Sequence, residues 1–274
     1  MRTRQLEPSA ITYNAVISAC GASGQWRDAV LILSDLQQLE VEASVITYSS
    51  AISACEKGGQ LTLALSLLGE LQHVRLEPNV ISYSAAISAC EKCGEWKPAM
   101  FLLGEIRQRR LTPNIFTYGA SISACVNGGR WQLALSLFDG LRESDLESTV
   151  ISHSAAISAC EKGGQWKRAV YLLGVMRRTQ MRPNVVSYSA AISACEKGGQ
   201  WQGALSLLSQ LRQTKMEQNI VGFSAAISAC EKLRRWKEAL WVLREARFAL
   251  LECDLISYSA VISACDKGQE WTCG

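Results

Sequence analysis

Cysteine recurs at a fixed interval of 35 residues along this chain of 274 residues. Without insertion or deletion, the series runs through Cys20, Cys55, Cys90, Cys125, Cys160, Cys195, Cys230 and Cys265. A fixed period of this length is typical of repeat proteins, in which one supersecondary unit stacks on the next and buries a continuous core. The sequence therefore predicts a repeat array whose function lies in positions that recur from unit to unit.

The repeat divides the chain into a leader, seven complete units and the start of an eighth. Residues 1–9 are the leader, which is the end of a preceding unit, residues 10–254 hold the seven units, and residues 255–274 are a partial unit. The units begin at Ala10, Val45, Val80, Ile115, Val150, Val185, Ile220 and Leu255, and positions 1 to 35 are counted from these residues. Because the sequence stops within the turn of a unit, we expect a fragment or a truncated chain.

Each unit carries two apolar stripes at helical spacing. The unit that begins at Val80 shows the first in Tyr83, Ile87 and Cys90, and a second follows the tryptophan near the middle of most units. Glycine pairs such as Gly163-Gly164 predict a tight turn between the two helices, with both glycines supplying backbone freedom. We predict an all-α fold, a right-handed α-solenoid superhelix of helix-turn-helix repeats, with the first helices lining the inner surface.

The composition argues against a membrane protein and against a disulfide framework. Apolar residues make up 48% of the chain, which supplies a core, but the longest apolar stretches are too short to cross a bilayer. Stacked helices lie roughly 8 to 10 Å apart, which is too far for a disulfide, so we predict reduced, buried cysteines. A net charge of +3 does not by itself indicate a nucleic-acid binder, and no targeting peptide is visible.

The sequence shows no catalytic or metal-binding motif. Its two histidines, His73 and His153, have no evident partner, and Cys90 with Cys93 makes a single C-x-x-C without a second ligand pair. The zinc deaminase signature, a phosphate loop and a G-x-S-x-G elbow do not occur. We therefore predict no enzyme, no metal, no cofactor and no small-molecule substrate, and expect protein partners to supply any catalysis.

The unit resembles the pentatricopeptide repeat of the 35-residue P type. Serine or threonine and then tyrosine stand early in the first helix, Cys-Glu-Lys-Gly-Gly at its end, Ala-Leu in the second helix and Pro-Asn at the close. Tetratricopeptide and ankyrin units normally have 34 and 33 residues. The resemblance, which covers nearly the whole chain, implies a single-stranded RNA partner read at one base per repeat. It also implies RNA processing, stability, editing or translation in a chloroplast or mitochondrion.

The resemblance further implies three sets of RNA-binding residues. Positions 5 and 35 would read the base edge, with Asn14, Ser44, Ser49, Asn79, Ser84, Asn114, Ser154, Asn184, Ser189, Asn219, Ser224 and Asp254. Position 2 would pack against the base, with Ile46, Ile81, Phe116, Ile151, Val186 and Val221. Position 13 would approach phosphate, with Lys57, Lys92, Lys162, Lys197, Lys232 and Lys267.

The pairs at positions 5 and 35 imply an RNA sequence. By the family's pairing rule, serine with asparagine favours adenine, Ser224 with Asp254 favours guanine, and Asn14 with Ser44 favours a pyrimidine. One unit combines glycine at position 5 with threonine at position 35 and leaves its base undefined. The implied target is pyrimidine-A-A-N-A-A-G, read from the N-terminus.

The residues themselves leave alternatives open. Position 2 could fill the core between units instead of meeting bases. The lysines at position 13 each follow an acidic residue and could form a solvated helix end. A concave helical solenoid could also be a protein–protein interaction scaffold; such a protein should vary its inner face to suit one partner, whereas serine and lysine repeat here almost unchanged.

Overall fold

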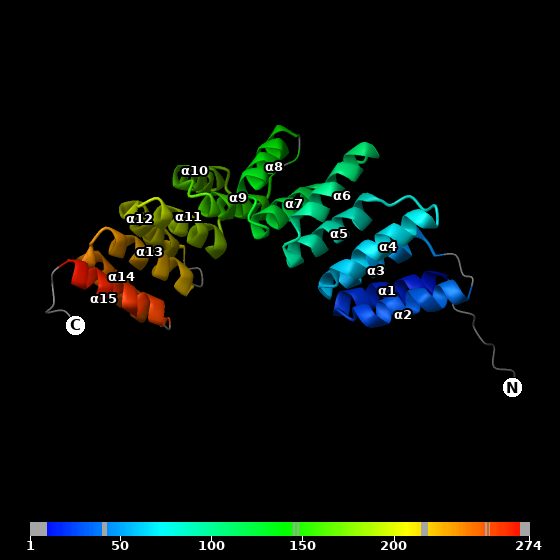
Figure 1. Cartoon of the computed structure of the whole chain (residues 1–274), viewed down its shortest axis with the longest axis horizontal. Helices are drawn as coiled ribbons and strands as arrows, with labels where there is room; N and C mark the ends of the chain where they lie inside the picture. Colours follow the sequence, from blue (N-terminus) through cyan, green and yellow to red (C-terminus); the bar gives the residue numbers. More distant parts are fainter. Residues whose placement is uncertain are drawn as a thin grey trace. The chain divides into compact units, whose positions relative to one another are not determined.

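The computed structural model describes residues 10–39, 43–144, 146, 148–214, 219–249, 251 and 253–268. Helices make up most of this part of the chain, in which no strand occurs (Figure 1). The first helices of the units are α1 (Ala10–Ser23), α3 (Val45–Lys57), α5 (Val80–Cys93), α7 (Ile115–Asn127), α9 (Val150–Lys162), α11 (Val185–Lys197), α13 (Ile220–Lys232) and α15 (Leu255–Lys267). The second helices are α2 (Trp26–Gln38), α4 (Leu61–His73), α6 (Trp96–Gln108), α8 (Trp131–Glu143), α10 (Trp166–Arg178), α12 (Trp201–Gln213) and α14 (Trp236–Phe248). The expected leader, 1–9, and the last residues of the partial unit, 269–274, lie outside the described residues.

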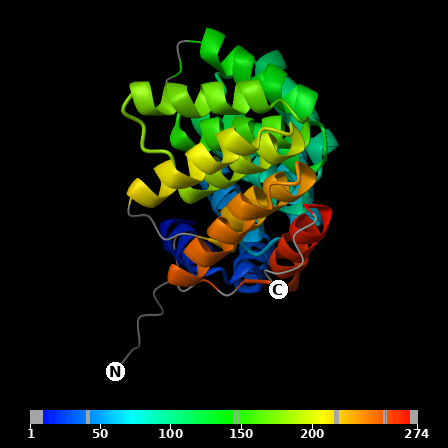
Figure 2. The same cartoon turned by 90° about the vertical axis from the view of Figure 1, so that its left-hand side faces the viewer.

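The chain divides into two compact parts, Met1–Arg130 and Trp131–Gly274. Within each part, an interior first helix packs against the first helices of the adjacent units and against two second helices, its own and the preceding one. Figure 2 shows this stacking in the second part, where successive helix pairs lie one upon the next. The arrangement confirms the predicted all-α solenoid of helix-turn-helix repeats. None of the helices described is long and apolar enough to span a bilayer.

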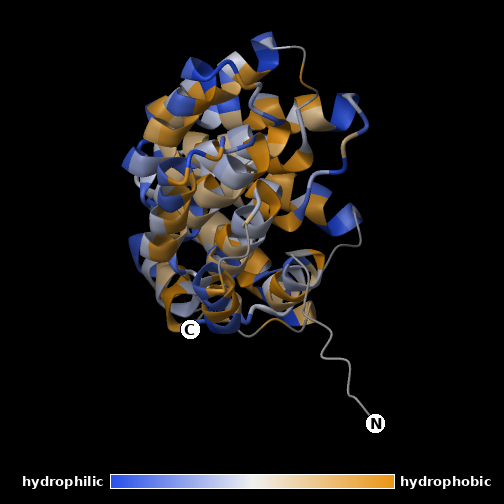
Figure 3. Ribbon diagram, turned by 90° about the vertical axis from the view of Figure 1, so that its right-hand side faces the viewer, coloured by the Kyte–Doolittle hydropathy of each residue, from blue (hydrophilic) through white to orange (hydrophobic). Residues whose placement is uncertain are grey.

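The first helices fill the core between units with small and medium side chains, and hydrophobic residues gather where helices face one another (Figure 3). In α5, Tyr83, Ile87 and Cys90 are fully buried. Burial raises the pKa of the Cys90 thiol to about 12, so this cysteine stays a protonated, unreactive filler. The other buried cysteines of the series are likewise not joined by disulfides, which agrees with the prediction of reduced thiols.

The turn between the two helices shows that the paired glycines have different roles. Gly199 has a φ of 65°, which is the left-handed backbone that glycine favours. Gly198 has an ordinary φ of −85°, but a Cβ on it would lie 2.2 Å from Cδ1 of Trp166 in the preceding unit. The prediction that both glycines supply backbone freedom is therefore wrong for the first one, which is small because a tryptophan packs on it.

Where one unit lacks this tryptophan, the next unit lacks the first glycine. Leu61 replaces tryptophan at the start of α4, and Cys93 replaces the first glycine at the end of α5, one unit later. At the intact positions, an added Cβ would also meet the ring of Trp26, Trp96 or Trp131 within 2.6 Å. The two replacements are in register. The first glycine is also replaced by Leu233 in the unit that follows Trp201, so the pairing of tryptophan with glycine does not hold in every unit.

Candidate nucleic-acid interface

The position 2 side chains form a row of exposed apolar groups on the first helices. Relative exposure is 65% for Ile46, 71% for Phe116 and 53% for Val221, and the values for Ile81, Ile151 and Val186 lie between 56% and 62%. These side chains therefore do not fill the core between units, and that alternative is wrong. They leave apolar surface available to pack against the faces of bases.

A cavity of about 320 Å³ brings the three predicted sets of residues together in the second unit. Its lining includes Ile46 and Ile81 from position 2 of adjacent units, Ser49 and Asn79 from positions 5 and 35, and Lys57 from position 13. It therefore has two apolar sides, a polar hydrogen-bonding pair and a cation. These are the groups that the faces, the edge and the phosphate of a nucleotide require.

The position 35 residues cap the first helix of the following unit. In each case the backbone before the helix is extended, and the side-chain oxygen accepts a hydrogen bond from the third N–H of the helix. For Asn79 the acceptor is Oδ1 and the donor is the N–H of Ser82, at 2.9 Å. Helix capping explains why serine, threonine, asparagine and aspartate occupy this position. It also fixes which side of the asparagine amide points away from the helix.

The position 5 residues lie beside these caps. Ser84 and Ser154 each donate a hydrogen bond of 2.7 Å to the carbonyl oxygen four residues earlier, and Ser189 donates directly to Oδ1 of Asn219 at 3.0 Å. Asn14 accepts a hydrogen bond at Oδ1 from the hydroxyl of Thr47. The structure therefore places the predicted base-reading pairs side by side within each part of the chain.

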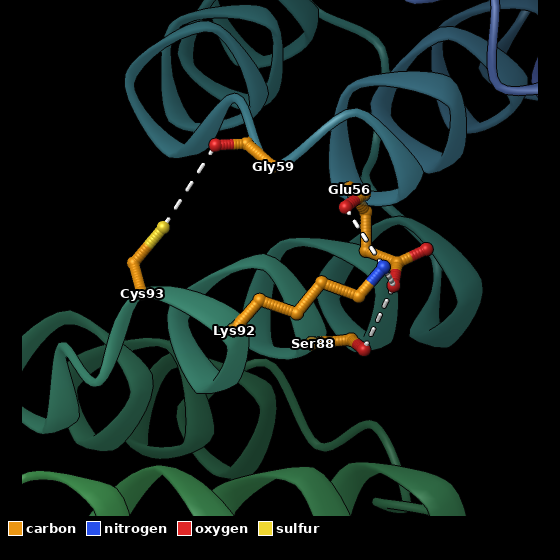
Figure 4. A network of polar contacts seen from close by, with 5 residues as sticks. All are labelled: Glu56, Gly59, Ser88, Lys92 and Cys93. Atoms are coloured by element: carbon orange, nitrogen blue, oxygen red, sulfur yellow. Dashed lines mark hydrogen bonds and ion pairs between the residues drawn. The ribbon is translucent and has the colours of Figure 1, made fainter.

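The lysines at position 13 are largely engaged in ion pairs between units, which the sequence did not predict. Lys92 Nζ lies 2.7 Å from Glu56 Oε1 of the preceding unit, and Figure 4 shows both Lys92 and Ser88 directed at the Glu56 carboxylate. The same pairing joins Lys197 to Glu161, Lys232 to Glu196 and Lys267 to Glu231, at 2.5 to 2.8 Å. Although partial burial opposes it, hydrogen bonds from Lys267 and Ser263 hold the pKa of Glu231 below its usual value. In each pair the glutamate offsets part of the positive charge that the lysine would offer to phosphate.

Two lysines and one glutamate do not take part in this series of ion pairs between units. Lys57 and Lys162 follow units that carry Gly21 and Val126 at the acidic position, and the described part of the structure gives them no ion pair. Glu91 faces Asn127 where six other units have lysine, and the Asn127 amide donates to the Glu91 backbone carbonyl instead. Burial raises the pKa of the Glu91 carboxyl, and a hydrogen bond from Ser123 partly offsets the increase. Among the described residues, the position 13 lysines without an ion pair are therefore Lys57 in the first part of the chain and Lys162 in the second.

Two groups contribute to this surface through interactions that sequence reasoning missed. One is the acidic residue at position 12, whose ion pair with the lysine of the next unit was not predicted. The other is a hydroxyl at position 3, carried by Thr47, Ser82, Thr117, Ser152, Ser187 and Ser257, which lies next to the caps. Both recur with the period of the chain, and the recurrence was the available signal. In the residues described, no group of three His, Cys, Asp or Glu side chains could hold a metal ion.

Comparison with solved structures supports the fold. The pentatricopeptide repeat protein PPR10 from maize matches with a TM-score of 0.65 and 20% identity, over 98% of this chain and 43% of that one. PPR10 in complex with an 18-nucleotide psaJ RNA element matches with a TM-score of 0.60 and 19% identity, over 97% and 44%. The PPR domain of Arabidopsis thaliana protein-only RNase P 1 in complex with tRNA matches with a TM-score of 0.58 and 12% identity, over 66% and 95%. This chain thus spans less than half the length of PPR10. No curated protein matches the sequence.

Family models identify the repeat. The pentatricopeptide repeat domain matches residues 31–93 and 136–198, and the PPR repeat family matches 78–127. The single PPR repeat matches 11–41, 116–146, 186–214 and 221–247. Since these matches extend over most of the 35-residue units that the cysteine series defines, the chain belongs to the pentatricopeptide repeat family of helical-repeat proteins.

Proposed function

We propose that this chain binds single-stranded RNA sequence-selectively, one base per repeat, along the exposed face of its first helices. The observation that carries the proposal is the cavity of the second unit, in which Ile46, Ile81, Ser49, Asn79 and Lys57 meet. A peptide-binding scaffold would not require an apolar slot, a hydrogen-bonding pair and a cation in this combination. The structures of PPR10 and of the RNase P 1 domain with RNA support the same class of partner.

The caps give a physical basis for base choice. Oδ1 of Asn79 accepts from the N–H and the hydroxyl of Ser82, so its amide offers N–H donors to a base. Adenine presents a ring-nitrogen acceptor beside an amino donor, and the oxygen of Ser49 can accept from the amino group. Asp254 is capped in the same way through Oδ1, which leaves Oδ2 as an acceptor. An acceptor suits guanine, whose edge carries N–H donors. The proposed target remains pyrimidine-A-A-N-A-A-G.

The chain acts without catalysis in this proposal. An occupied stretch of RNA is protected from nucleases, held open or presented to an enzyme, and protein partners supply any chemistry. From the family resemblance, we place the action of this chain in an organelle, either chloroplast or mitochondrion. The process it serves there is RNA processing, stability, editing or translation.

The experiment replaces one of the residues that are proposed to read the base. Asn79→Asp keeps a capping oxygen but replaces the outward N–H donors by an acceptor, so the preference at the second base should move from adenine towards guanine. Gln108→Glu, at the end of α6, makes the same change of charge on a second helix and should leave base preference unaltered. Fluorescence anisotropy with RNAs that differ only at this base measures both. An identical response of the two variants would contradict base reading by Asn79 and favour a scaffold whose RNA binding is nonspecific.

A further inference from the structure

A hydroxyl at position 3 lies between the two proposed base readers of the preceding unit. In the fifth unit, the Oγ atoms of Ser187 and Ser154 are 2.7 Å apart, and the Ser187 hydroxyl donates to Oδ1 of Asn184 at 2.8 Å. Ser187 is fully buried. It therefore joins the position 5 and position 35 side chains without being exposed to a base.

The same bridge recurs in other units. Ser82 joins Ser49 to Asn79, with distances of 2.7 and 3.0 Å, and Ser257 joins Ser224 to Asp254, with distances of 2.8 and 2.6 Å. Two further bridges run through Thr47 and Thr117. The bridge thus serves the pairs proposed for adenine, guanine and a pyrimidine alike.

The bridge determines the hydrogen-bonding character of both readers. Oδ1 of Asn184 accepts from the N–H of Ser187 at 2.9 Å and from its hydroxyl, which uses both of its lone pairs. The amide is then held with its N–H groups outward. Because the Ser187 proton is directed at Asn184, the single hydroxyl proton of Ser154 is donated either to the Ser187 oxygen or to the carbonyl oxygen of Val150, each of which lies 2.7 Å away. Ser154 is left with lone pairs, so the pair offers a donor and an acceptor in fixed places.

One unit lacks the bridge. Gly222 occupies position 3 after Ser189 and Asn219, and there the cap bond from the Gly222 N–H to Asn219 is long, at 3.4 Å. Ser189 donates directly to Asn219 at 3.0 Å, which is the one close hydrogen bond to this amide within the described residues. A Cβ on Gly222 would lie 3.6 Å from Ser189 Oγ and 3.5 Å from Ile192 Cδ1, which are ordinary contact distances. A serine therefore fits at this site.

We propose that the position 3 hydroxyl is a positioning residue for base selectivity, which fixes the donor side of the position 35 amide and the acceptor side of the position 5 serine. The inference rests on the proposed RNA-binding function. The proposal separates the units that carry serine with asparagine into two kinds. In most of them a position 3 hydroxyl joins the two readers, whereas in the sixth unit Gly222 leaves them without that hydroxyl. The base of the sixth unit should be discriminated less strictly than that of the fifth, although both units carry serine with asparagine.

The test installs and removes the bridge. Gly222→Ser should raise the preference for adenine over guanine at the sixth base about fivefold, the factor that one hydrogen bond of ordinary net strength gives. Gly222→Ala adds the Cβ without the hydroxyl and should leave that ratio at the wild-type value. Ser187→Ala should lower the ratio at the fifth base by a similar factor and leave the sixth base unchanged. Urea unfolding of each variant shows whether it is folded.

The outcomes distinguish a failure of the proposed positioning role from a failure of the proposed RNA binding. If the wild type prefers adenine at the second base but Gly222→Ser behaves like Gly222→Ala, the positioning role is refuted while RNA reading stands. If Ser187→Ala weakens all RNAs by the same factor, the hydroxyl is structural only and the inference fails. If the wild type binds no RNA, both the function and the inference are refuted. Should Ser187→Ala fail to fold, the Gly222 variants decide the question by themselves.

Discussion

Glu196→Gln tests whether ion pairs between units restrain the lysines that are proposed to meet phosphate. Lys232 Nζ lies 2.5 Å from Glu196 Oε1, and the carboxylate side chain is only 16% exposed whereas the lysine is 53% exposed. The glutamine keeps the shape of the side chain but removes its charge. Since the lysine is half exposed and the glutamine can still accept its hydrogen bond, the loss should be about 1 kcal/mol and the fold should be little affected.

The expected effect is on the salt dependence of RNA binding. A released lysine adds one phosphate contact, which steepens the plot of log K against log salt by about 0.7 for a single strand. Between about 50 and 200 mM salt, the variant should therefore lose about 2.6-fold more affinity than the wild type loses. Anisotropy titrations of one RNA across this range measure the slope.

The matched control is Asp139→Asn, which makes the same change in net charge. Asp139 pairs with Arg168, and the two residues lie on the second helices α8 and α10. This variant should keep the wild-type slope. The reasoning is refuted if the two variants steepen the slope equally, since the effect would then be one of net charge, or if Glu196→Gln leaves the slope unchanged.

Further predictions concern stability, and urea unfolding measures each of them. Gly198→Ala forces a Cβ against the Trp166 ring and should lower the free energy of unfolding by about 1 to 3 kcal/mol. In a protein that also carries Trp166→Leu, this loss should largely disappear. An equal loss with and without Trp166→Leu would contradict the packing of the tryptophan on the glycine. Burial lowers the pKa of His153, although the Thr149 carbonyl opposes the shift. The free energy of unfolding should therefore decrease as the pH falls below about 6.5, because the buried imidazole must then take up a proton. His153→Tyr should lessen this decrease. Burial raises the pKa of Glu91, so stability should decrease as the pH rises above about 4.5. Glu91→Gln should abolish that decrease and be the more stable protein at pH 7.

The 35-residue period made the fold predictable, because it fixes both helices of each unit and their partners in the next. The second helices begin at Trp96, Trp131, Trp166 and Trp201, as the apolar stripes predicted. The reason for the first turn glycine was not predictable from one unit, since its constraint is a tryptophan one unit earlier. Only the folded structure shows that the tryptophan ring lies against the glycine backbone of the next unit.

The candidate site was predictable in position but not in its interactions. Family resemblance and spacing placed Ser49, Asn79 and Lys57 on one surface, and the structure gathers them around one cavity. Sequence did not show that Lys92 is paired with Glu56, because the adjacent Glu91 is the nearer acid along the chain while the ion pair forms between units. Hydroxyl bridges were missed for the same reason, because their partners are about 30 residues apart.

The central claim is sequence-selective binding of single-stranded RNA, and a direct titration tests it. Fluorescence anisotropy compares an RNA carrying pyrimidine-A-A-N-A-A-G with a scrambled RNA and with the DNA of the same sequence, at two salt concentrations. The account predicts tightest binding to the matched RNA, with a log–log slope near −1.4 from Lys57 and Lys162, the position 13 lysines without an ion pair among the described residues, at about −0.7 each. Equal binding to all three molecules, or binding to none, would contradict it.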